Sequence, residues 1–490
     1  MTEIKENEEK ITEEVLDHST DEKNTQKKCY SCGSTDISLN TETGNLRCNF
    51  CRSEQPKELF ADKTVDSLDK KYISKGASDI KSDASDIVTL KCTSCGAEVV
   101  IDTTDSAQSR CHWCRNYLSI NNQIENGAIP DALLPFNVLK DSAKKEIENF
   151  VGKRKFFALK KFKSEFTSDN ILGVYFPYLL IDIKAKCQFH GKGERLVRKY
   201  QVKSGKHTST RYDADLYDVK RDFDIFIDDL SIEASDDKLS YHANKTNNII
   251  NSIMPFDTEN SVVWDANYLR GFSSEKRDIN IDKIDNIVKS QSLDVARHSI
   301  NNTLNFYDRG VCWNDEKVES IGEFWKAVYL PVWLYSYQQK KGHKNIIHYL
   351  AVNGRTKEVM GSVPIDQFKL FAVSFMLEVI GFFFWWTYLI DEDFGWLCMT
   401  IGFIYYGIIH VRYRNDNARH YHEIETLKEV SNVVKEDNFI KHEYRLNRSK
   451  ISGANNHSIN SRSLNQTMFG KAVDVLSSSD DNDIDTFLPE

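Results

Sequence analysis

The longest apolar runs of the chain lie late in the sequence. Residues 370–390 are almost wholly apolar, residues 395–411 form a second apolar run, and residues 391–394 between them hold three acids. At a rise of about 1.5 Å per residue, the first run spans roughly 32 Å, which matches a hydrocarbon core of about 30 Å. The pattern predicts a two-helix transmembrane hairpin. A pair of buried core helices is the alternative.

A mixed apolar and polar pattern covers residues 131–365. Helical spacing predicts a helix over about 140–152, and an apolar, β-rich stretch covers residues 173–183. From Phe223 to Ile227 apolar residues alternate mostly with acids, as in a half-exposed strand. Asn353-Gly354 between two apolar-rich runs predicts a hairpin. We therefore expect an α+β body in this region.

One seven-residue stretch of the body has an echo. Val174–Leu180 reads Val-Tyr-Phe-Pro-Tyr-Leu-Leu, and Val328–Leu334 reads Val-Tyr-Leu-Pro-Val-Trp-Leu. Proline cannot donate to a central ladder, so each proline is expected at an edge, start or bulge position. The echo predicts two related halves; a chance match is the alternative that the sequence leaves open.

The remaining segments are polar. Residues 1–28 hold nine acids, five lysines and no apolar run, which predicts a disordered acidic leader and no signal peptide. Residues 56–91 are a linker by composition, and residues 415–490 are expected to be a polar cytosolic tail. The whole chain of 490 residues carries a net charge of −9. This charge disfavours broad attraction to nucleic-acid phosphates but leaves room for a local basic patch.

Eight of the eleven cysteines form two blocks with identical spacing. In each block a Cys-x-x-Cys pair is followed, after fifteen residues, by a second pair. The first block is Cys29, Cys32, Cys48 and Cys51, and the second is Cys92, Cys95, Cys111 and Cys114. Four thiolates presented by two tight turns suit a tetrahedral zinc ion, so we expect two small β zinc ribbons, residues 29–55 and 92–120, each with one structural Zn²⁺. Disulfides and redox dithiols are the alternatives, which the lack of a secretory leader and of a βαβ context disfavours.

Residues next to the cysteines refine this picture. Gly33 and Gly96 follow the second cysteine of each block, where a backbone with positive φ is expected. Phe50 and Trp113 precede the fourth cysteine; they could stack on bases, but packing on the ribbon's own sheet is the favoured interpretation. Each ribbon holds three acids and two arginines, a net charge of −1. Nucleic-acid binding by the ribbons is therefore not expected.

The sequence contains no recognised catalytic motif. A phosphate-binding loop, a nucleophile elbow and a His-Glu-x-x-His segment are all missing from it. A zinc ion with four cysteine ligands has no open position for chemistry. We therefore expect a protein that is not an enzyme.

Charges around the apolar runs predict an orientation. Lys369, Arg412 and Arg414 flank the runs, whereas the loop between them is acidic, so the positive-inside rule places both termini in the cytoplasm of a multi-pass membrane protein. Glu378 is the one charge inside the first run. Either it makes a polar contact with the second helix near Tyr406, or its carboxylate bends toward the membrane surface.

Several motifs together resemble a known family. They are the two ribbons, Leu134-Pro135-Phe136, the two Val-Tyr-x-Pro stretches, Tyr268-Leu269-x-Gly271-Phe272 and Val352-Asn353-Gly354-x-Thr356, followed by two apolar runs. In this order they resemble the bacterial zinc-ribbon membrane proteins, which are often labelled transcription-factor-IIB-type or primosomal-helicase-like. The resemblance covers about residues 29–411. It implies no catalytic activity, and it implies a phage-shock-protein-A-like partner, since some relatives are encoded beside such proteins.

The expected function combines these features. The chain is predicted to be a non-enzymatic, membrane-anchored zinc-ribbon scaffold or adaptor that docks a cytosolic protein at the lipid bilayer, in envelope stress. The alternative is a membrane-tethered zinc-ribbon protein that binds nucleic acid. Salt-sensitive binding to DNA would favour the alternative.

Overall fold

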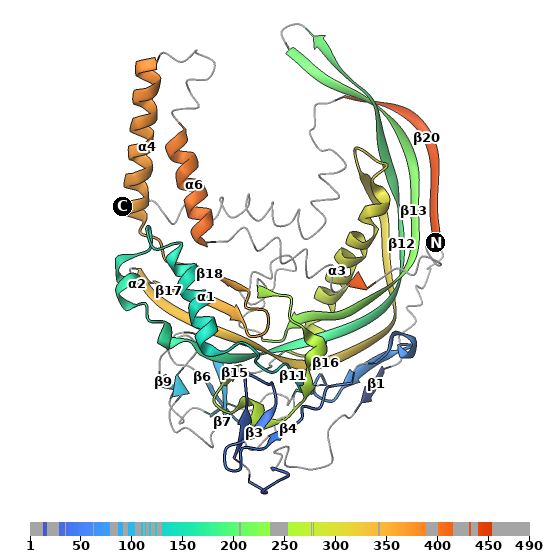
Figure 1. The fold of residues 1–490 in the computed structure, drawn as a ribbon. Coiled ribbons are helices and arrows are strands. Elements are labelled where there is room, and N and C mark those ends of the chain that lie inside the picture. Colours follow the sequence, from blue (N-terminus) through green and yellow to red (C-terminus); the bar gives the residue numbers. More distant parts are fainter. Residues whose placement is uncertain are drawn as a thin grey trace.

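The computed structural model of the chain has one large β-sheet, with helices and smaller sheets packed around it (Figure 1). The structure describes residues 13–16, 29–34, 36–61, 63–78, 87–91, 97–102, 109–110, 113, 117–118, 123–124, 130–204, 207–235, 253–275, 277, 279–341, 344–388, 400–414, 431–432 and 440–452.

Two long hairpins form the centre of the sheet. The first joins β12 (Leu172–Ser204) to β13 (His207–Glu233), and the second joins β16 (Val311–Lys341) to β17 (Lys344–Asn353). β12 lies between β13 and β16 and is antiparallel to both. The distal parts of β12 and β13, with β20 (Ile440–Ser452) along β13, curve away from the body as a wing (Figure 1).

Shorter strands complete the 15-stranded sheet and two small sheets. The other members of the large sheet are β1 (Glu13–Leu16), β5 (Lys71–Ser74), β6 (Ile87–Lys91), β7 (Glu98–Asp102), β10 (Gln123–Ile124), β11 (Ala132–Leu133), β14 (Val262–Val263), β15 (Ser273–Glu275), β18 (Val359–Gly361) and β19 (Ser431–Asn432). The small sheets are β2 (Ile37–Leu39), β3 (Leu46–Cys48) and β4 (Glu54–Gln55), and β8 (Ser109–Arg110) with β9 (Tyr117–Leu118).

Few helices accompany these strands. The α-helices are α1 (Lys140–Gly152), α2 (Lys160–Glu165), α3 (Ile281–Ile300), α4 (Gln367–Tyr388) and α6 (Ile401–Arg414). The 3-10 helices are η1 (Val65–Ser67), η2 (Ser168–Asn170), η4 (Thr258–Asn260), η5 (Ala266–Leu269) and η6 (Asn301–Leu304). α3 buries Ile284, Val288 and Val295 in the core cluster that also holds the apolar side chains of β12 and β13.

Several local predictions for the body are confirmed. The helix expected over 140–152 is α1, which buries Ala143, Ile147 and Val151 at helical spacing. The alternating apolar residues from Phe223 to Ile227 lie buried on one face of β13. Asn353-Gly354 joins β17 to β18, whose antiparallel pairing makes the expected hairpin.

The two echoing stretches pair with each other at the centre of the sheet. Val174 lies opposite Val332 and Tyr178 lies opposite Val328, so a local two-fold axis relates the two stretches. Pro177 lies one residue before the ladder between β12 and β13, and Pro331 lies one residue before the ladder between β16 and β17. The N–H that proline lacks is therefore not needed in either ladder.

The leading strand of each half pairs with the long strand of the other half. β11 is parallel to β16, with Ala132 opposite Val328, and β15 is parallel to β12, with Ser273 opposite Val174. Helices and a long hairpin follow each leading strand, namely α1, α2, β12 and β13 in the first half and α3, β16 and β17 in the second. The two segments therefore share the order of leading strand, helix and long hairpin.

The fold class expected from the sequence is wrong in two respects. The molecule is mostly β-sheet with few helices, not an α+β body with a transmembrane hairpin. Within the described residues, no helix combines the length and the apolar character needed to cross a bilayer. The hairpin predicted at 370–390 and 395–411, the membrane anchoring and the multi-pass localisation are corrected accordingly. Residues 389–399, which hold the end of the first run, the acidic loop and the start of the second run, lie outside the described residues.

Polar residues of α4 contact α6 and the segment between α1 and α2. Glu378 accepts a hydrogen bond from the backbone N–H of Gly402 at 2.8 Å, which favours the polar contact between helices over a carboxylate bent away. The partner is one turn from Tyr406, whose hydroxyl donates to Gln367 at 2.8 Å. Lys369 donates to the carbonyl of Phe156 at 2.7 Å and so ties α4 to the segment between α1 and α2.

Candidate metal centre

The first cysteine block forms two turns with the same hydrogen bonds. The N–H of Cys29 donates to the carbonyl of Ser34, and the carbonyl of Cys29 accepts from Gly33, both at 2.8 Å. Cys48 makes the same two bonds, to the residues five and four positions later, at 2.9 Å. The two turns therefore present their cysteine pairs in matching geometry, as a tetrahedral site requires.

The residue after each pair adopts the left-handed conformation. Gly33 has φ 71°, which confirms the expected positive φ, and Arg52 has φ 62° at the equivalent place. A non-glycine residue in this region costs about 1–2 kcal/mol, so the second turn carries strain that the first avoids. Gly96, the counterpart in the second block, lies outside the described residues.

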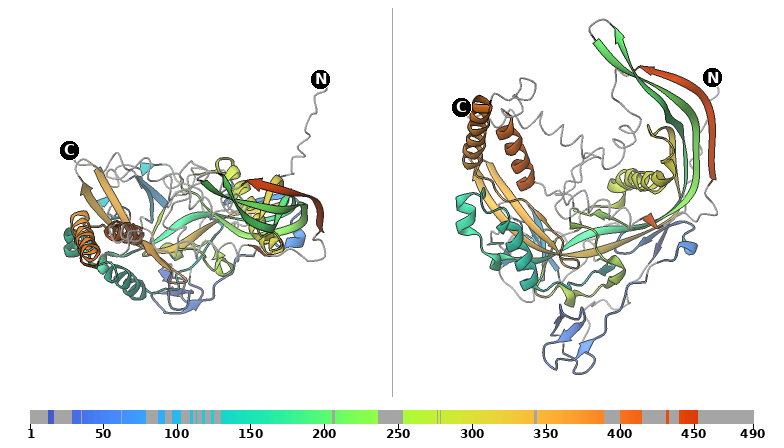
Figure 2. Two further views of the ribbon diagram at one scale, coloured as in Figure 1. Left: turned by 90° about the horizontal axis from the view of Figure 1, so that it is seen from above. Right: turned by 45° about the horizontal axis from the view of Figure 1, so that its top comes forward.

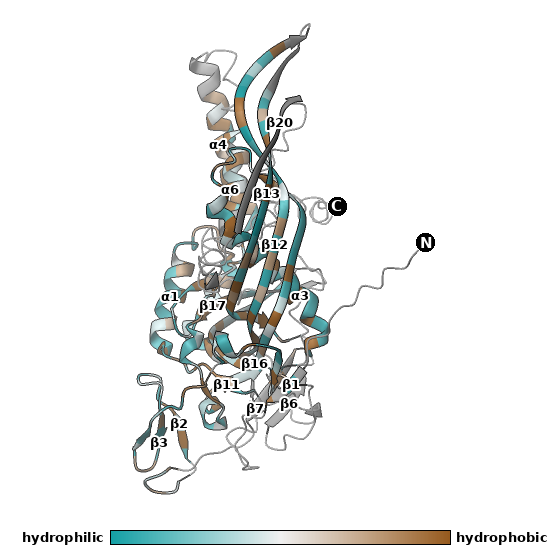
Figure 3. Ribbon diagram, turned by 90° about the vertical axis from the view of Figure 1, so that its right-hand side faces the viewer, coloured by the Kyte–Doolittle hydropathy of each residue, from teal (hydrophilic) through white to brown (hydrophobic). Residues whose placement is uncertain are grey.

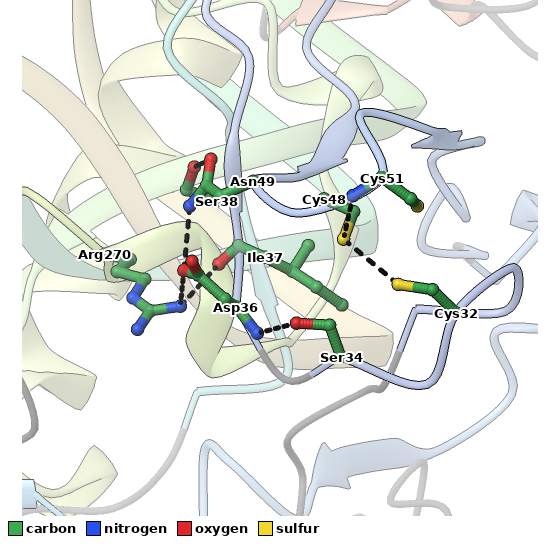
Figure 4. A network of polar contacts seen from close by, with 9 residues as sticks. All are labelled: Cys32, Ser34, Asp36, Ile37, Ser38, Cys48, Asn49, Cys51 and Arg270. Atoms are coloured by element: carbon green, nitrogen blue, oxygen red, sulfur yellow. Dashed lines mark hydrogen bonds and ion pairs between the residues drawn. The ribbon is translucent and has the colours of Figure 1, made fainter.

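The four sulfur atoms converge. Cys29 Sγ lies 3.5 Å from Cys51 Sγ, and Cys32 Sγ lies 3.6 Å from Cys48 Sγ (Figure 4 shows the second pair). All four lie within 4.8 Å of one another. Zinc–sulfur bonds of about 2.3 Å in a tetrahedron place sulfurs about 3.8 Å apart, so small shifts would complete the site. The prediction that these four cysteines share one metal position is thus geometrically sound.

Ser53 favours the thiolate form of two ligands. Its hydroxyl lies 3.2 Å from Cys29 Sγ and 3.0 Å from Cys51 Sγ. The contact with Ser53 is the largest of the causes that lower the pKa of Cys29, to about 6, and the pKa of Cys51, whereas desolvation and the neighbouring thiols raise the pKa of Cys32 to about 12. Because metals bind the thiolate, a lowered pKa lets the site compete with protons for the metal at neutral pH.

A carboxylate fixes the hairpin that carries the cysteine turns. Glu54 on β4 accepts hydrogen bonds from Asn40 at 2.7 Å, from Thr43 at 3.1 Å and from Asn45 at 3.3 Å. These bonds, chiefly that from Asn40, lower the pKa of Glu54. The loop between β2 and β3 is therefore held against β4, and the small sheet stays rigid around the metal position.

One side of this ribbon is fixed to the body. Ile37 is fully buried in a core cluster that includes Tyr268 and Leu269. The Arg270 guanidinium donates to the Asp36 carboxylate at 2.8 Å and to the carbonyl of Ile37 at 3.4 Å (Figure 4). In Figures 1 and 2 the ribbon strands lie at the opposite end of the molecule from α4 and the wing.

The motifs of the family resemblance meet behind the ribbon. Phe272 stacks on Phe136 at 4.6 Å between ring centroids and meets Tyr175 edge-on at 5.7 Å. Trp333 also packs against Phe136 and donates its indole N–H to the carbonyl of Val138 at 2.8 Å. Residues 268–272, which contact the ribbon, are thus also part of the aromatic core around the two echoing strands.

The second cysteine block is described only in part. Cys92, Cys95, Cys111 and Cys114 lie outside the described residues, as does His112. Trp113 is described and is buried in the body, where its indole N–H donates to Glu275 at 3.2 Å and its ring meets Phe176 and Tyr349 edge-on. Phe50 at the equivalent position is 80% exposed. The expectation of packing on the ribbon's own sheet is therefore wrong for Phe50, whereas Trp113 belongs to a core cluster that also holds Val99 of β7.

Sequence reasoning did not find a buried charge cluster in the body. Asp182, Asp228 and Asp229 place carboxylate oxygens within 4.8 Å of one another. The Lys326 ammonium lies 2.6 Å from Asp229 and 3.6 Å from Asp182, so the protein itself supplies a cation there. In the sequence, only the two adjacent acids 228 and 229 could have pointed to this cluster, because Asp182 and Lys326 come from distant strands. We interpret the cluster as structural.

Comparisons with known proteins give limited information. No protein-family model matches the chain, and no solved structure matches it. The chain is similar to YdjG, an uncharacterized protein of Bacillus subtilis (strain 168), with 23% identity over 347 residues. The match covers 70% of this chain and 92% of that protein.

Proposed function

We propose that the chain is a non-enzymatic scaffold whose metal-loaded ribbon docks another protein. The observation that carries this proposal is the two-sided character of the ribbon. Ile37 and Arg270 fix one side to the body, whereas Tyr30 and Phe50, within the two cysteine turns, are 69% and 80% exposed. Exposed aromatic side chains on a rigid support are typical anchors of protein–protein interfaces.

We assign the metal as zinc. Four cysteine thiolates in tetrahedral arrangement are the ligand set of structural zinc sites and leave no open coordination position. The equal spacing of Cys92, Cys95, Cys111 and Cys114 supports a second zinc ion in the same chain. Elemental analysis of the reduced protein tests both assignments, with two zinc ions per chain as the expected result and fewer than one as the contradicting result.

The partner that we test first is a phage-shock-protein-A-like protein, as the family resemblance implies. The ribbon's net charge of −1 gives little reason to expect nucleic acid at this surface. A protein partner would bury the two exposed rings and gain from their large, rigid apolar area.

The experiment is a binding titration with a zinc-loaded double variant, Tyr30→Ser with Phe50→Ser. Aromatic interface anchors contribute about 2 kcal/mol or more each, so we expect at least a tenfold loss of affinity for the phage-shock-protein-A homologue from the same genome. Phe156→Ser is the matched control, because Phe156 is 60% exposed but lies between α1 and α2. Unchanged affinity in the double variant, with zinc retained, would contradict the docking role of the ribbon.

A further inference from the structure

The wing concentrates positive charge in an otherwise acidic chain. From Lys192 to Arg211 the sequence has seven Lys and Arg residues and one acid, whereas the whole chain carries −9. We call residues 192–202 of β12, together with residues 212–217 of β13, which face residues 193–199, the cationic ribbon. This set holds four Lys and Arg residues and three acids, and three further cations lie in residues 203–211. Such a local reversal of sign is the usual electrostatic mark of a surface that binds a polyanion.

The β12 strand of the cationic ribbon is exposed on both faces. Five consecutive residues, Arg195 to Lys199, are exposed, although neighbouring residues of a strand point to opposite faces. β16 pairs with β12 only as far as Gly193, so beyond that point β12 is an edge of the wing among the residues that the structure describes. Figure 3 shows the wing standing clear of the body, with hydrophilic and hydrophobic bands along β12.

The cationic ribbon holds three acids with little exposed side chain, and Asp215, 8% exposed, lies opposite Arg195. Asp213, with a side chain 7% exposed, accepts from Arg198 at 2.8 Å. Glu194, with a side chain 12% exposed, accepts from Arg309 at 2.9 Å. Lys192, Arg195 and Lys199 are exposed cations of the same stretch. Asp218, opposite Lys192, has a side chain 34% exposed and contacts His190 at 2.8 Å.

Aromatic rings are interleaved with these cations. The Arg195 guanidinium lies 4.4 Å from the ring centroid of Phe306, and Lys199 lies 5.7 Å from that of Tyr212. Phe306 is itself 38% exposed. A ring holds a cation in place without neutralising its charge, so these groups are arranged in advance for an anionic ligand.

We propose that the cationic ribbon binds single-stranded nucleic acid, at a site separate from the metal centre. Cations along an extended edge suit a phosphate backbone, and interleaved rings with exposed area suit unpaired bases, which stack on aromatic side chains. An acidic protein segment would use the charges but not the rings, and a duplex has no unpaired bases to stack. This inference does not depend on the protein-docking role proposed for the metal ribbon.

The experiment measures binding of the full-length, zinc-loaded protein to a fluorescein-labelled oligothymidylate by anisotropy over a series of salt concentrations. The test variant combines Lys192→Gln, Arg195→Gln and Lys199→Gln, which leaves the Arg198–Asp213 and Arg309–Glu194 pairs in place. Each lost phosphate contact lowers the slope of log affinity against log salt by about 0.7 for single strands, so we expect a slope smaller by about 2 and at least a tenfold loss of affinity.

A matched control changes three exposed lysines elsewhere by the same chemistry: Lys145→Gln, Lys153→Gln and Lys155→Gln on and after α1. We expect it to bind within twofold of the unmodified protein. A second variant, Phe306→Ser, should bind severalfold more weakly with an unchanged salt slope, because it removes stacking and no phosphate contact.

The proposal would be overturned by no binding of the unmodified protein, by equal losses in the test and control triple variants, by tighter binding to a duplex of the same length, or by equal competition from polyglutamate. Retained binding in the Tyr30→Ser, Phe50→Ser variant would support a separate site, and lost binding there would place the nucleic acid on the metal ribbon instead. A melting temperature equal to that of the unmodified protein shows that each variant is folded.

Discussion

Ser53 stands between two thiols of the metal centre, and Ser34 occupies the matching place in the other cysteine turn. The Ser53 hydroxyl contacts Cys29 and Cys51, whereas the Ser34 hydroxyl accepts from the backbone N–H of Asp36 at 3.0 Å. The two serines thus offer a controlled comparison of a hydroxyl that supports thiolates with one that supports only a turn.

We expect Ser53→Ala to weaken zinc binding roughly tenfold at neutral pH, because a hydrogen bond to a charged acceptor is lost. Without it the pKa values of Cys29 and Cys51 rise, so protons displace the metal more easily. The midpoint of acid-induced zinc release therefore moves to higher pH, as a chromophoric chelator would report. Ser34→Ala should leave that midpoint in place, and equal shifts in both variants would refute the role of Ser53.

Cysteine spacing predicted the four ligands because the two turns are local. The left-handed Gly33 was predictable for the same reason, whereas Arg52 gave no signal, since arginine rarely adopts positive φ. Arg270 and Asp36 are separated by 234 residues, and no pattern in either segment indicates that they meet. Long-range contacts of this kind come from the assembled sheet.

At the scale of elements, the docking of β2 on η5 decides how firmly the ribbon is held. Ile37 of β2 is fully buried in this contact. The Arg270–Asp36 pair beside it is partly exposed, with side chains 22% and 54% exposed. Partly exposed ion pairs contribute at most about 1 kcal/mol, whereas a buried isoleucine contributes several times more. The apolar contact is therefore the main attachment.

Ile37→Ala should destabilise the ribbon by about 2–5 kcal/mol, because it leaves a cavity in this contact. Hydrogen exchange should become faster in residues 29–55 and remain unchanged in β12 and β16. Ser38→Ala, one residue along the same strand and only half-buried, is the control and should change little. Exchange rates in the ribbon equal to those of the unmodified protein would mean that the metal centre alone holds it in place.

Strand lengths were the least predictable feature of the elements. Alternation identified the buried part of β13, and an apolar run identified residues 173–183 of β12. From Lys192 to Val202, however, β12 is mostly polar and exposed, so its sequence has no two-residue pattern. This part stays extended because it pairs with β13. The sequence of one strand does not indicate which other strand it pairs with.

At the scale of the whole molecule, the three long strands β12, β13 and β16 meet around the buried Lys326. Its ammonium, only 3% exposed, lies between Asp182 on β12 and Asp229 on β13. Asp182 also accepts from the backbone N–H of Asp229 at 2.9 Å, at an irregular point of the ladder between the two strands. Burial makes each charge dependent on the others.

Lys326→Met should reduce the free energy of unfolding by about 3–5 kcal/mol, because it leaves two buried carboxylates without their cation. Lys317→Met on the same strand is the control, since Lys317 is 57% exposed and pairs with the exposed Glu319. That change should stay within about 1 kcal/mol. Denaturant unfolding followed by tryptophan fluorescence measures both, and similar effects of the two changes would contradict the importance of burial.

The pairing of β12 with β16 has a consequence for synthesis on the ribosome. β12 needs β16 as its central neighbour, yet Val328 emerges about 150 residues after Val174. At about 5–20 residues per second, the first half is exposed without its partner strand for roughly 8–30 s. During that time the apolar stretch from Val174 to Leu180 is an unpaired strand edge, which is prone to aggregate. Newly made chains should therefore need a ribosome-associated chaperone more than the finished protein does.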